Sequence, residues 1–215
     1  MATNLKNKRI LITAGPTWVK IDKVRVISNI ASGQTGFLIS RQLQKQGARV
    51  TLILGPVGGY CLPEGIKVIN YRYFEELSKI LRKQVKPGKY HILIHAAAVS
   101  DFQPADNFGL KIPSSKKPFN LKLVATAKLI ERIKKADPDI FLVGFKLLPE
   151  ASRSRLLKSA ASLIDNSKAD LVVANTFRGK AYRAVILDSK RTYAFVWGKQ
   201  ALAKNLAAVL RSTLK

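Results

Sequence analysis

Residues Lys8–Leu43 read KRILITAGPTWVKIDKVRVISNIASGQTGFLISRQL, and the rest of the sequence is understood from this stretch. It opens with an apolar run, residues 10–14, that is typical of a buried strand. A polar loop follows, after which Gly36, Ile39 and Leu43 recur at helical spacing and share one face. The stretch therefore predicts a strand, a loop large enough to surround a phosphate, and the start of a helix.

The predicted start of this helix is suited to binding an anion. The first turn of a helix presents unpaired backbone N–H groups and the positive end of the helix dipole, and Gly33 and Gly36 leave room for a ligand. The spacing lacks the first glycine of the dinucleotide fingerprint and the Gly-Lys-Ser/Thr ending of a P-loop. Arg25 and Asn29 stand just upstream, so we expect a charged donor and a neutral donor to face one pocket.

Apolar runs that predict strands alternate along the chain with amphipathic helical periods. This alternation is typical of a mostly parallel sheet with helices on both faces, so the predicted fold class is α/β, a Rossmann-like three-layer sandwich. Such sheets bind ligands beyond the carboxyl ends of their strands, where the strand order reverses. The strands are expected at residues 9–13, 49–54, 67–71, 91–97, 140–145 and 170–174, and the helical stripes at residues 36–43, 74–81, 129–133, 156–164 and 202–210.

Two further segments are expected to be a hairpin and a loop. The hairpin, at about 183–197, either adds antiparallel strands to the sheet or stands out as an arm for dimerisation. Residues 103–118 contain three prolines and three lysines without any period, which is typical of a mobile loop or lid. We expect a single domain over residues 1–215.

The chain is strongly basic. Lys and Arg number 38 against 13 Asp and Glu, which is a formal charge of +25, and such a charge favours anionic partners, nucleic acid above all. The basic residues are nevertheless scattered through almost every segment, and no helix-turn-helix, zinc-finger or RNA-binding aromatic signature is present. A generally basic solvated surface is the favoured interpretation, and nucleic-acid binding is the less favoured alternative that the charge leaves open.

Cysteine and histidine are scarce. With Cys61, His91 and His95 as their only representatives, neither a disulfide framework nor a Cys/His metal site is expected. His95 lies inside a predicted strand, where we expect a buried, hydrogen-bonded side chain rather than a base. A lone thiol, together with no apolar run of signal-peptide or membrane-helix length, leads us to expect a cytoplasmic protein without a membrane segment.

Six motifs follow one another along the chain: ITAGPT at 12–17, DKVRVISN at 22–29, SG at 32–33 with a glycine at 36, AAVSDF at 97–102, VGFKLL at 143–148 and DLVVAN at 170–175. As an ordered set they resemble the phosphopantothenoylcysteine synthetase family, also known as the C-terminal domain of the DNA/pantothenate metabolism flavoproteins. The likeness extends from about Arg9 to Asn175. Since no flavoprotein region stands upstream in this sequence, the stand-alone form is expected.

The resemblance implies a ligase of coenzyme A synthesis that joins phosphopantothenate and cysteine. A nucleoside triphosphate would activate the carboxylate as an acyl-nucleotidyl anhydride with release of pyrophosphate, and the cysteine amine would then displace the nucleotide. Asn29 matches the family's asparagine that binds this intermediate, and Arg25 matches its arginine. Lys111 matches the loop lysine needed for the attack by cysteine.

The resemblance also implies a nucleotide site and a homodimer. The expected co-substrate is CTP, with ATP as the alternative, and the expected cofactor is Mg²⁺, for which no metal-ligating residue is assigned. Family members dimerise with the lysine loop reaching toward the partner's site. The residues assigned to the nucleotide are Ser32, Gly33, Gly36, Ala97, Asp101, Phe145, Lys128 and Lys158.

The sequence departs from the family pattern in four places. Residues 18–20 replace a charged, proline-containing run, Ala31 replaces a serine that contacts the triphosphate, and residues 126–128 replace an Asn-Pro-Asp. The lysine cluster after Lys111 is displaced to 116–117, so a neighbouring lysine is an alternative to Lys111.

Three other interpretations stay open at this point. One is an NAD(P)-dependent oxidoreductase on the same kind of sheet, which the missing glycine and the lack of a Tyr-x-x-x-Lys pair disfavour. Another is a basic nucleic-acid-binding module, and the third is a paralogue that binds nucleotide without performing any chemistry.

Overall fold

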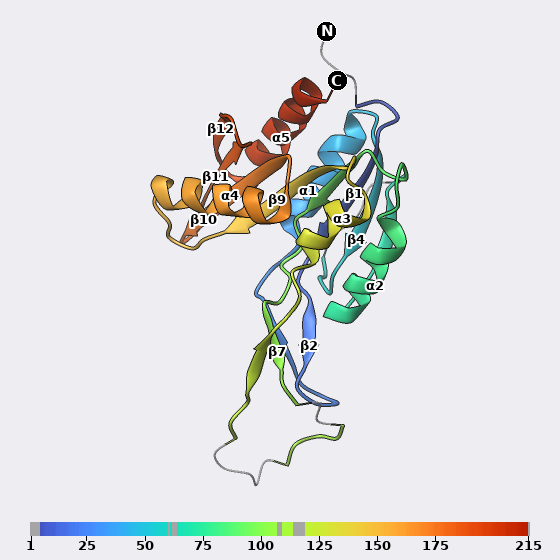
Figure 1. Cartoon of the computed structure of the whole chain (residues 1–215), viewed down its shortest axis with the longest axis vertical. Coiled ribbons are helices and arrows are strands. Elements are labelled where there is room, and N and C mark those ends of the chain that lie inside the picture. Colours follow the sequence, from blue (N-terminus) through green and yellow to red (C-terminus); the bar gives the residue numbers. More distant parts are fainter. Residues whose placement is uncertain (1–4, 60, 62–63, 107–108, 114–118, 215) are drawn as a thin grey trace.

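The fold is built on one eight-stranded sheet with helices on both faces (Figure 1). The computed structural model describes residues 5–59, 61, 64–106, 109–113 and 119–214. The strand order is β12-β11-β10-β9-β6-β1-β4-β5. The six strands from β10 to β5 in this order are mutually parallel, and β11 is antiparallel to both of its neighbours, β10 and β12. These strands are β1 (Arg9–Ala14), β4 (Arg49–Leu54), β5 (Lys67–Asn70), β6 (Ile92–His95), β9 (Phe141–Leu147), β10 (Leu171–Arg178), β11 (Ala181–Leu187) and β12 (Thr192–Trp197).

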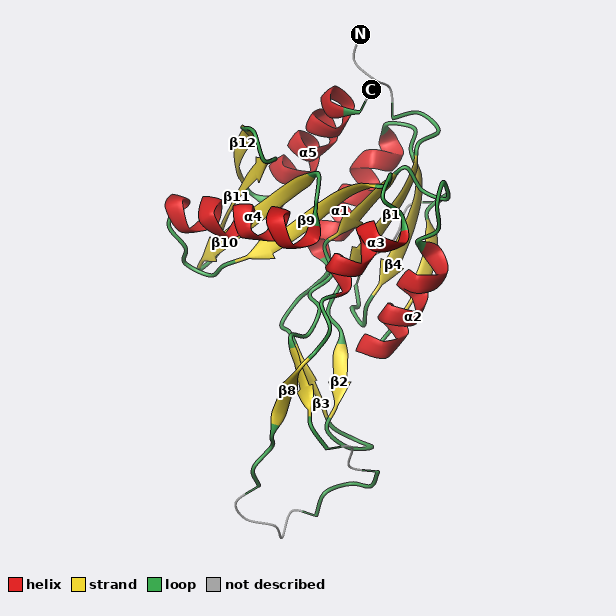
Figure 2. Cartoon of the chain, viewed as in Figure 1, coloured by secondary structure: helices red, strands yellow, loops and turns green. Residues whose placement is uncertain are grey.

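The helices form the two outer layers (Figure 2). Alternate residues of β1 explain why both layers are needed: Ile10 and Ile12 pack in the core beneath α1 and α5, whereas Leu11 packs in the core beneath α2, α3 and α4. An apolar run buried on both faces is typical of a parallel sheet. The helices are α1 (Gln34–Lys45), α2 (Phe74–Gln84), η1 (Leu129–Arg132), α3 (Ile133–Ala136), α4 (Arg153–Ser167) and α5 (Lys199–Thr213).

The predicted three-layer α/β fold is confirmed. Each of the six predicted strands overlaps an observed one, and the five helical stripes fall on α1, α2, η1 with α3, α4 and α5. The C-terminal hairpin, β11 with β12, joins the sheet next to β10 and does not project as an arm. Of the two arrangements that the sequence left open, the structure therefore has the first.

The projecting arm is formed by other segments, which the sequence did not predict as strands. Two short hairpins, one inserted after β1 and one after β6, extend away from the edge of the sheet (Figures 1 and 2). The second hairpin includes part of the loop expected at 103–118, whose residues 107–108 and 114–118 lie outside the described residues. The strands of this arm are β2 (Trp18–Lys20), β3 (Val26–Ser28), β7 (Phe102–Pro104) and β8 (Leu123–Ala125).

Gly36 is explained by the packing of α1 on β1. It is buried in the first turn of α1, and a Cβ built on it would overlap the Cβ of Ala14. The glycine therefore sets how closely the helix approaches the strand, which fixes the height of the helix start above the sheet. This close approach accounts for the glycine without any ligand, and a role of Gly36 in nucleotide binding stays a prediction.

We expect Gly36→Ala to lower the free energy of unfolding by about 1–3 kcal/mol, because the added methyl overpacks the contact with Ala14. Urea denaturation followed by circular dichroism measures this. Gly58→Ala is the matched control, since nothing lies within 4 Å of a Cβ at that position. Equal stability of the two variants would show that α1 shifts freely on β1.

Candidate functional site

The strand order reverses between β1 and β6, which are neighbours in the sheet. From β1 the chain proceeds to β4 and β5 on one side, and from β6 it proceeds to β9 and β10 on the other. Open α/β sheets bind their ligands beyond the carboxyl ends of the strands at such a point. The arm leaves the sheet from the same two strand ends (Figure 1). The candidate site therefore lies where the sheet and the arm meet.

The segments that follow β1 and β6 continue to pair after the sheet has ended. The Ala98 N–H donates to the Gly15 carbonyl at 2.9 Å, and the Thr17 N–H donates to the Ala98 carbonyl at 3.2 Å. The Thr17 hydroxyl then accepts the Ser100 N–H at 2.8 Å. The loop after β1 is thereby held against the segment after β6.

Tyr71, just after β5, forms hydrogen bonds to the start of the loop that follows β1. Its buried hydroxyl lies 3.1 Å from the carbonyl oxygens of Ala14 and Gly15. Burial raises the pKa of this phenol, so it remains protonated and donates. Gly55 passes so close that an added Cβ would overlap the Pro16 carbonyl oxygen. The shape of the loop thus depends on neutral groups in tight contact.

The start of α1 borders this loop, as predicted. Gly33 is the N-cap with φ of 73°, a left-handed conformation that glycine adopts without strain. Ser32 Oγ accepts the Gln34 N–H at 3.4 Å. A Cβ on Gly33 would lie 3.4 Å from Val57 and 3.5 Å from Gly15. The helix start and the loops after β1 and β4 therefore line one region, and ligand binding by Ser32 and Gly33 stays a prediction.

A buried polar network holds the end of β6. Thr13 Oγ1 accepts the Ala97 N–H at 3.2 Å and lies 2.9 Å from His95 Nδ1, so its proton can go to the ring. Burial lowers the pKa of His95 to about 4, which keeps the ring neutral at pH 7. The prediction that His95 is buried and hydrogen-bonded is confirmed. Ala97, assigned to the nucleotide, is positioned by this network.

Asn29 lies against the segment that follows β6. Its amide nitrogen donates to the carbonyl oxygens of Ala98, at 3.1 Å, and Val99, at 3.3 Å. Both amide protons are thus directed at the backbone, and the side-chain oxygen remains as an acceptor. The structure therefore brings Asn29 to the switch point, and a donor role toward a ligand requires these two bonds to open.

Arg25 does not face one pocket with Asn29, contrary to the expectation from their spacing. Its guanidinium donates to Asp22 Oδ2 from two nitrogens, at 2.5 and 2.9 Å, and to the Ile112 carbonyl at 2.8 Å. The reason is local: the turn between β2 and β3 folds the side chain back onto Asp22, whose side chain is fully buried. Arg25 therefore belongs to the arm.

Asp101 and Lys128, both assigned to the nucleotide, are brought together. Lys128 Nζ lies 2.5 Å from Asp101 Oδ1, and the two side chains are 54% and 66% exposed respectively. An ion pair this exposed contributes about 1 kcal/mol or less to stability, so a ligand can replace either partner at little cost. This pair stands at the base of the arm, because the Thr126 N–H donates to the Asp101 carbonyl.

The remaining predicted residues are spread over three elements. Phe145 is half-buried on β9 and packs against the core beneath α1 and α5. Lys158 is exposed on α4 and belongs to none of the three ion pairs that the described residues form. Lys111 is exposed in the arm, next to buried Ile112.

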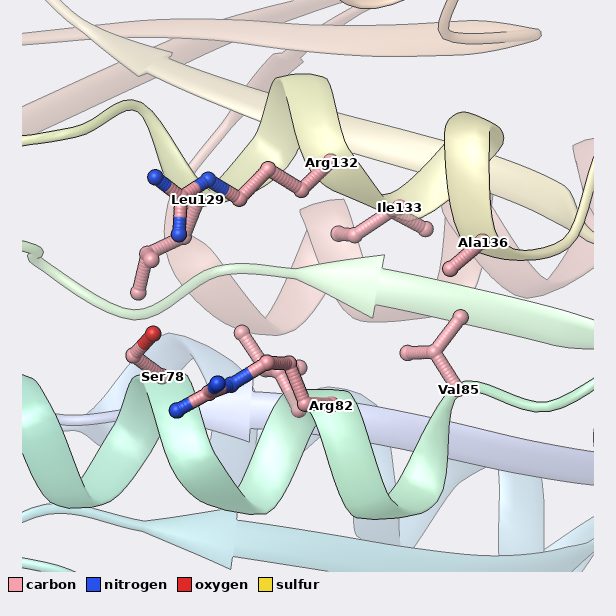
Figure 3. Close-up of a pocket in the computed structure, with 8 residues that line it drawn as sticks. Ser78, Arg82, Val85, Leu129, Arg132, Ile133 and Ala136 are labelled. Carbon is pink, nitrogen blue, oxygen red and sulfur yellow. The ribbon is translucent and has the colours of Figure 1, made fainter.

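A small hollow elsewhere in the molecule contains none of the predicted site residues. It lies between α2 and the η1–α3 segment, where the side chains of Arg82, Arg132 and Ser78 border a mostly apolar surface (Figure 3). The candidate site is consequently a surface of converging loops rather than this cavity. The hollow is lined by Ser78, Leu81, Arg82, Val85, Leu129, Arg132, Ile133 and Ala136.

Comparison with known proteins assigns the chain to a family. Residues 5–212 match the family described as DNA/pantothenate metabolism flavoprotein C-terminal domain. The chain belongs to this family. The match extends over nearly the whole fold, the arm included, and confirms the resemblance that the ordered motifs indicated.

Two similar proteins illustrate the membership. The coenzyme A biosynthesis bifunctional protein CoaBC of Thermococcus kodakarensis is 38% identical over 175 residues, which are 81% of this chain and 43% of that protein. The chain thus spans less than half of that relative. The solved structure of the DNA/pantothenate metabolism flavoprotein from Streptococcus pneumoniae is 26% identical with a TM-score of 0.85, and the match covers 95% of this chain and 98% of that one.

A further solved structure with the same fold is that of Cab2 in complex with phosphopantothenate-cysteine. It is 18% identical with a TM-score of 0.72, and the match covers 96% of this chain and 89% of that one. At this identity the likeness shows the shared fold.

Among the residues that the structure describes, no helix is long and apolar enough to cross a membrane.

Sequence reasoning missed three residues that shape the site. Thr17 belongs to a motif that was recognised, but a hydroxyl in a loop gives no sign of its partner. Tyr71 ends a predicted strand, and its contact with Gly15 depends on the order of β5, β4 and β1. Asp22 also lies in a recognised motif, and a possible signal was its place three residues before Arg25, the spacing at which an acidic side chain can pair with an arginine in a turn.

We expect the stability of the protein to fall as the pH decreases from 6.5 to about 4, because the unfolded chain binds a proton at His95 that the folded chain does not. The loss attributable to this group is about 3 kcal/mol and is complete below its folded pKa. Urea denaturation as a function of pH measures it.

His95→Gln should abolish that part of the pH dependence. His91→Gln is the comparison: partial burial, together with the positive charges of Arg9 and Lys8, lowers the pKa of His91 as well, so this variant is expected to remove a smaller part of the pH dependence. An unchanged pH dependence in His95→Gln would contradict the assignment of the effect to this ring.

Proposed function

We propose that the chain is a phosphopantothenate-cysteine ligase that forms phosphopantothenoylcysteine through an acyl-nucleotidyl intermediate. The observation that carries this proposal is the match of residues 5–212 to a family in which relatives are named coenzyme A biosynthesis proteins. Family membership favours this function over an NAD(P)-dependent oxidoreductase and over a basic nucleic-acid-binding module.

In the first step the carboxylate of phosphopantothenate attacks the α-phosphorus of CTP, and the bond to pyrophosphate breaks. Backbone N–H groups at the start of α1, beside Ser32 and Gly33, are suited to hold phosphate oxygens. Lys128 contacts Asp101 through Oδ1. Asp101 can accept a hydrogen bond from the ribose at Oδ2 while this ion pair is present, or at either oxygen once the pair has opened. We propose that the nucleotide is CTP rather than ATP. We also propose that Phe145, Lys158 and Gly36 contact it.

Magnesium is expected to accompany the triphosphate. Within the described ranges no group of three His, Cys, Asp or Glu is arranged to hold a metal ion. Mg²⁺ usually binds through substrate phosphates and one or two carboxylates, and Asp101 is a carboxylate of the candidate site. When bound, the ion would neutralise phosphate charge and promote departure of pyrophosphate.

In the second step the amine of cysteine attacks the acyl carbon, the amide bond forms, and the nucleoside monophosphate leaves. Negative charge develops on the acyl oxygen, and the Asn29 amide can donate a hydrogen bond to it once its bonds to the Ala98 and Val99 carbonyls have opened. Lys111 supplies a positive charge for the same step. We also propose a cytoplasmic location, which the lone cysteine favours.

We expect pyrophosphate release that requires both phosphopantothenate and CTP, measured without and then with cysteine, and a lower rate with ATP. Lys111→Gln should retain pyrophosphate release but lose about a hundredfold in the rate of amide formation, because one charged donor to the transition state is removed. Lys122→Gln, an exposed lysine of the same arm, is the matched control. Absence of pyrophosphate with either nucleotide would refute the ligase.

We further propose that the chain forms a homodimer through the arm. Of the eleven large hydrophobic side chains that are exposed among the described residues, eight belong to the arm. A concentration of exposed apolar residues on one projecting element is typical of an interaction surface. The eight are Val24, Val26, Ile30, Phe102, Leu110, Phe119, Leu123 and Val124.

Leu123→Asp is expected to weaken the dimer by at least about tenfold, because a charge is placed in the apolar contact. Light scattering over a range of concentrations measures the dissociation constant. Trp197→Asp provides the comparison, since Trp197 is 69% exposed on β12, within the hairpin expected at 183–197. If Trp197→Asp separates the subunits and Leu123→Asp does not, the interface is on the hairpin.

A further inference from the structure

Asp22 is a buried carboxylate in the turn between β2 and β3. Its Oδ1 accepts the N–H groups of Val24, at 2.9 Å, and Arg25, at 2.8 Å, and its Oδ2 accepts the Arg25 guanidinium. Burial opposes ionisation, yet these hydrogen bonds outweigh it and hold the pKa of Asp22 well below its usual range. The arm therefore contains a buried negative charge, and both oxygens of this carboxylate accept hydrogen bonds from residues of the same turn.

One residue of a distant segment is attached to this pair. The Ile112 N–H donates to Asp22 Oδ2 at 3.1 Å, and the Arg25 guanidinium donates to the Ile112 carbonyl at 2.8 Å. Both backbone polar groups of Ile112 are thus engaged, and its side chain is 7% exposed. The preceding residues, Leu110 and Lys111, are exposed. Ile112 is a fixed point immediately beside Lys111.

We propose that Asp22 and Arg25 form a clamp that holds Ile112 and thereby positions Lys111 for the amide-forming step. The inference rests on the proposed ligase function. A lysine samples a large volume when its backbone is free, and fixing the next residue confines that volume. Asp22 and Arg25 act in this way as positioning residues. Arg25 accordingly has a role other than the ligand contact that its place in the motif suggested.

Arg25 is suited to this clamp because of the shape of its guanidinium. It contacts the carboxylate through two nitrogens while a donor remains for the carbonyl of Ile112. A lysine keeps the charge but lacks the planar fork, so Arg25→Lys cannot reproduce both contacts. Asp22→Asn removes the negative charge and replaces one acceptor by a donor. Asp22→Asn thus weakens the contact with the Ile112 N–H, and Arg25→Lys weakens the contact with the Ile112 carbonyl.

The first test uses no substrate. Trypsin cleaves after Lys111, at the bond whose N–H belongs to Ile112, and cleavage requires that this residue leave the clamp. We expect native-state cleavage after Lys111 to be faster by about tenfold or more in Asp22→Asn and in Arg25→Lys. Cleavage after Lys180, in the turn between β10 and β11, is the internal reference. Asp106→Asn and Lys23→Gln, which alter exposed charges of the arm, are the matched controls.

The second test separates the two steps of the reaction. Asp22→Asn should leave pyrophosphate release without cysteine within about twofold of wild type and slow amide formation by about tenfold to a hundredfold. Because the clamp acts through Lys111, adding Asp22→Asn to Lys111→Gln should cause no further loss. A role of Asp22 in folding alone would give an additive loss. Asp22→Ser is used in the same way where Asp22→Asn does not fold, and Arg25→Lys serves in the proteolysis test alone.

The outcomes discriminate the clamp from the ligase. Unchanged cleavage after Lys111 in both variants would overturn the clamp. Faster cleavage with an unchanged amide-forming step, or with an additive loss in the double variant, would overturn the positioning of Lys111. If the wild type releases no pyrophosphate, the ligase proposal fails, and the proteolysis result still decides whether Ile112 is clamped.

Discussion

The pairing of the segments after β1 and β6 is the constraint on which the rest of the structure depends. Two neighbouring parallel strands would ordinarily separate at the edge of the sheet. Here the hydrogen bonds of Gly15 and Thr17 with Ala98, and of Thr17 with Ser100, carry the pairing beyond that edge. The arm can project from the sheet because its two hairpins start from a ribbon that is already joined.

The same pairing explains how a switch point becomes a site. The loop after β1 is held from one side by Ala98 and from below by the Tyr71 hydroxyl, and the start of α1 borders it at Gly33. Most of these contacts are made by backbone groups, glycines and neutral hydroxyls. Charged groups such as Asp101 remain exposed at the rim, where they are available to a ligand. The contacts that shape the site are therefore made mainly by neutral groups, and its charged groups lie at the exposed rim.

Predictability differed between the sheet and the arm for a physical reason. The strand at residues 10–14 is buried on both faces, so its side chains form a continuous apolar run that the sequence displays directly. The strands of the arm are three residues long and largely exposed, which leaves no period to recognise. Arg25 was misplaced because spacing along the chain does not give the direction of a side chain, and Asp22 engages it three residues away.

The sequence by itself determined the α/β fold and the family, because buried periodicity and ordered motifs are local properties. Tertiary structure alone decided that Tyr71 supports Gly15, that Asn29 faces the carbonyls of Ala98 and Val99, and that Ile112 is bound by Asp22 and Arg25. Each of these contacts joins segments that are far apart in the chain. Their partners are set by strand order and by the path of the arm, which no short stretch of sequence encodes.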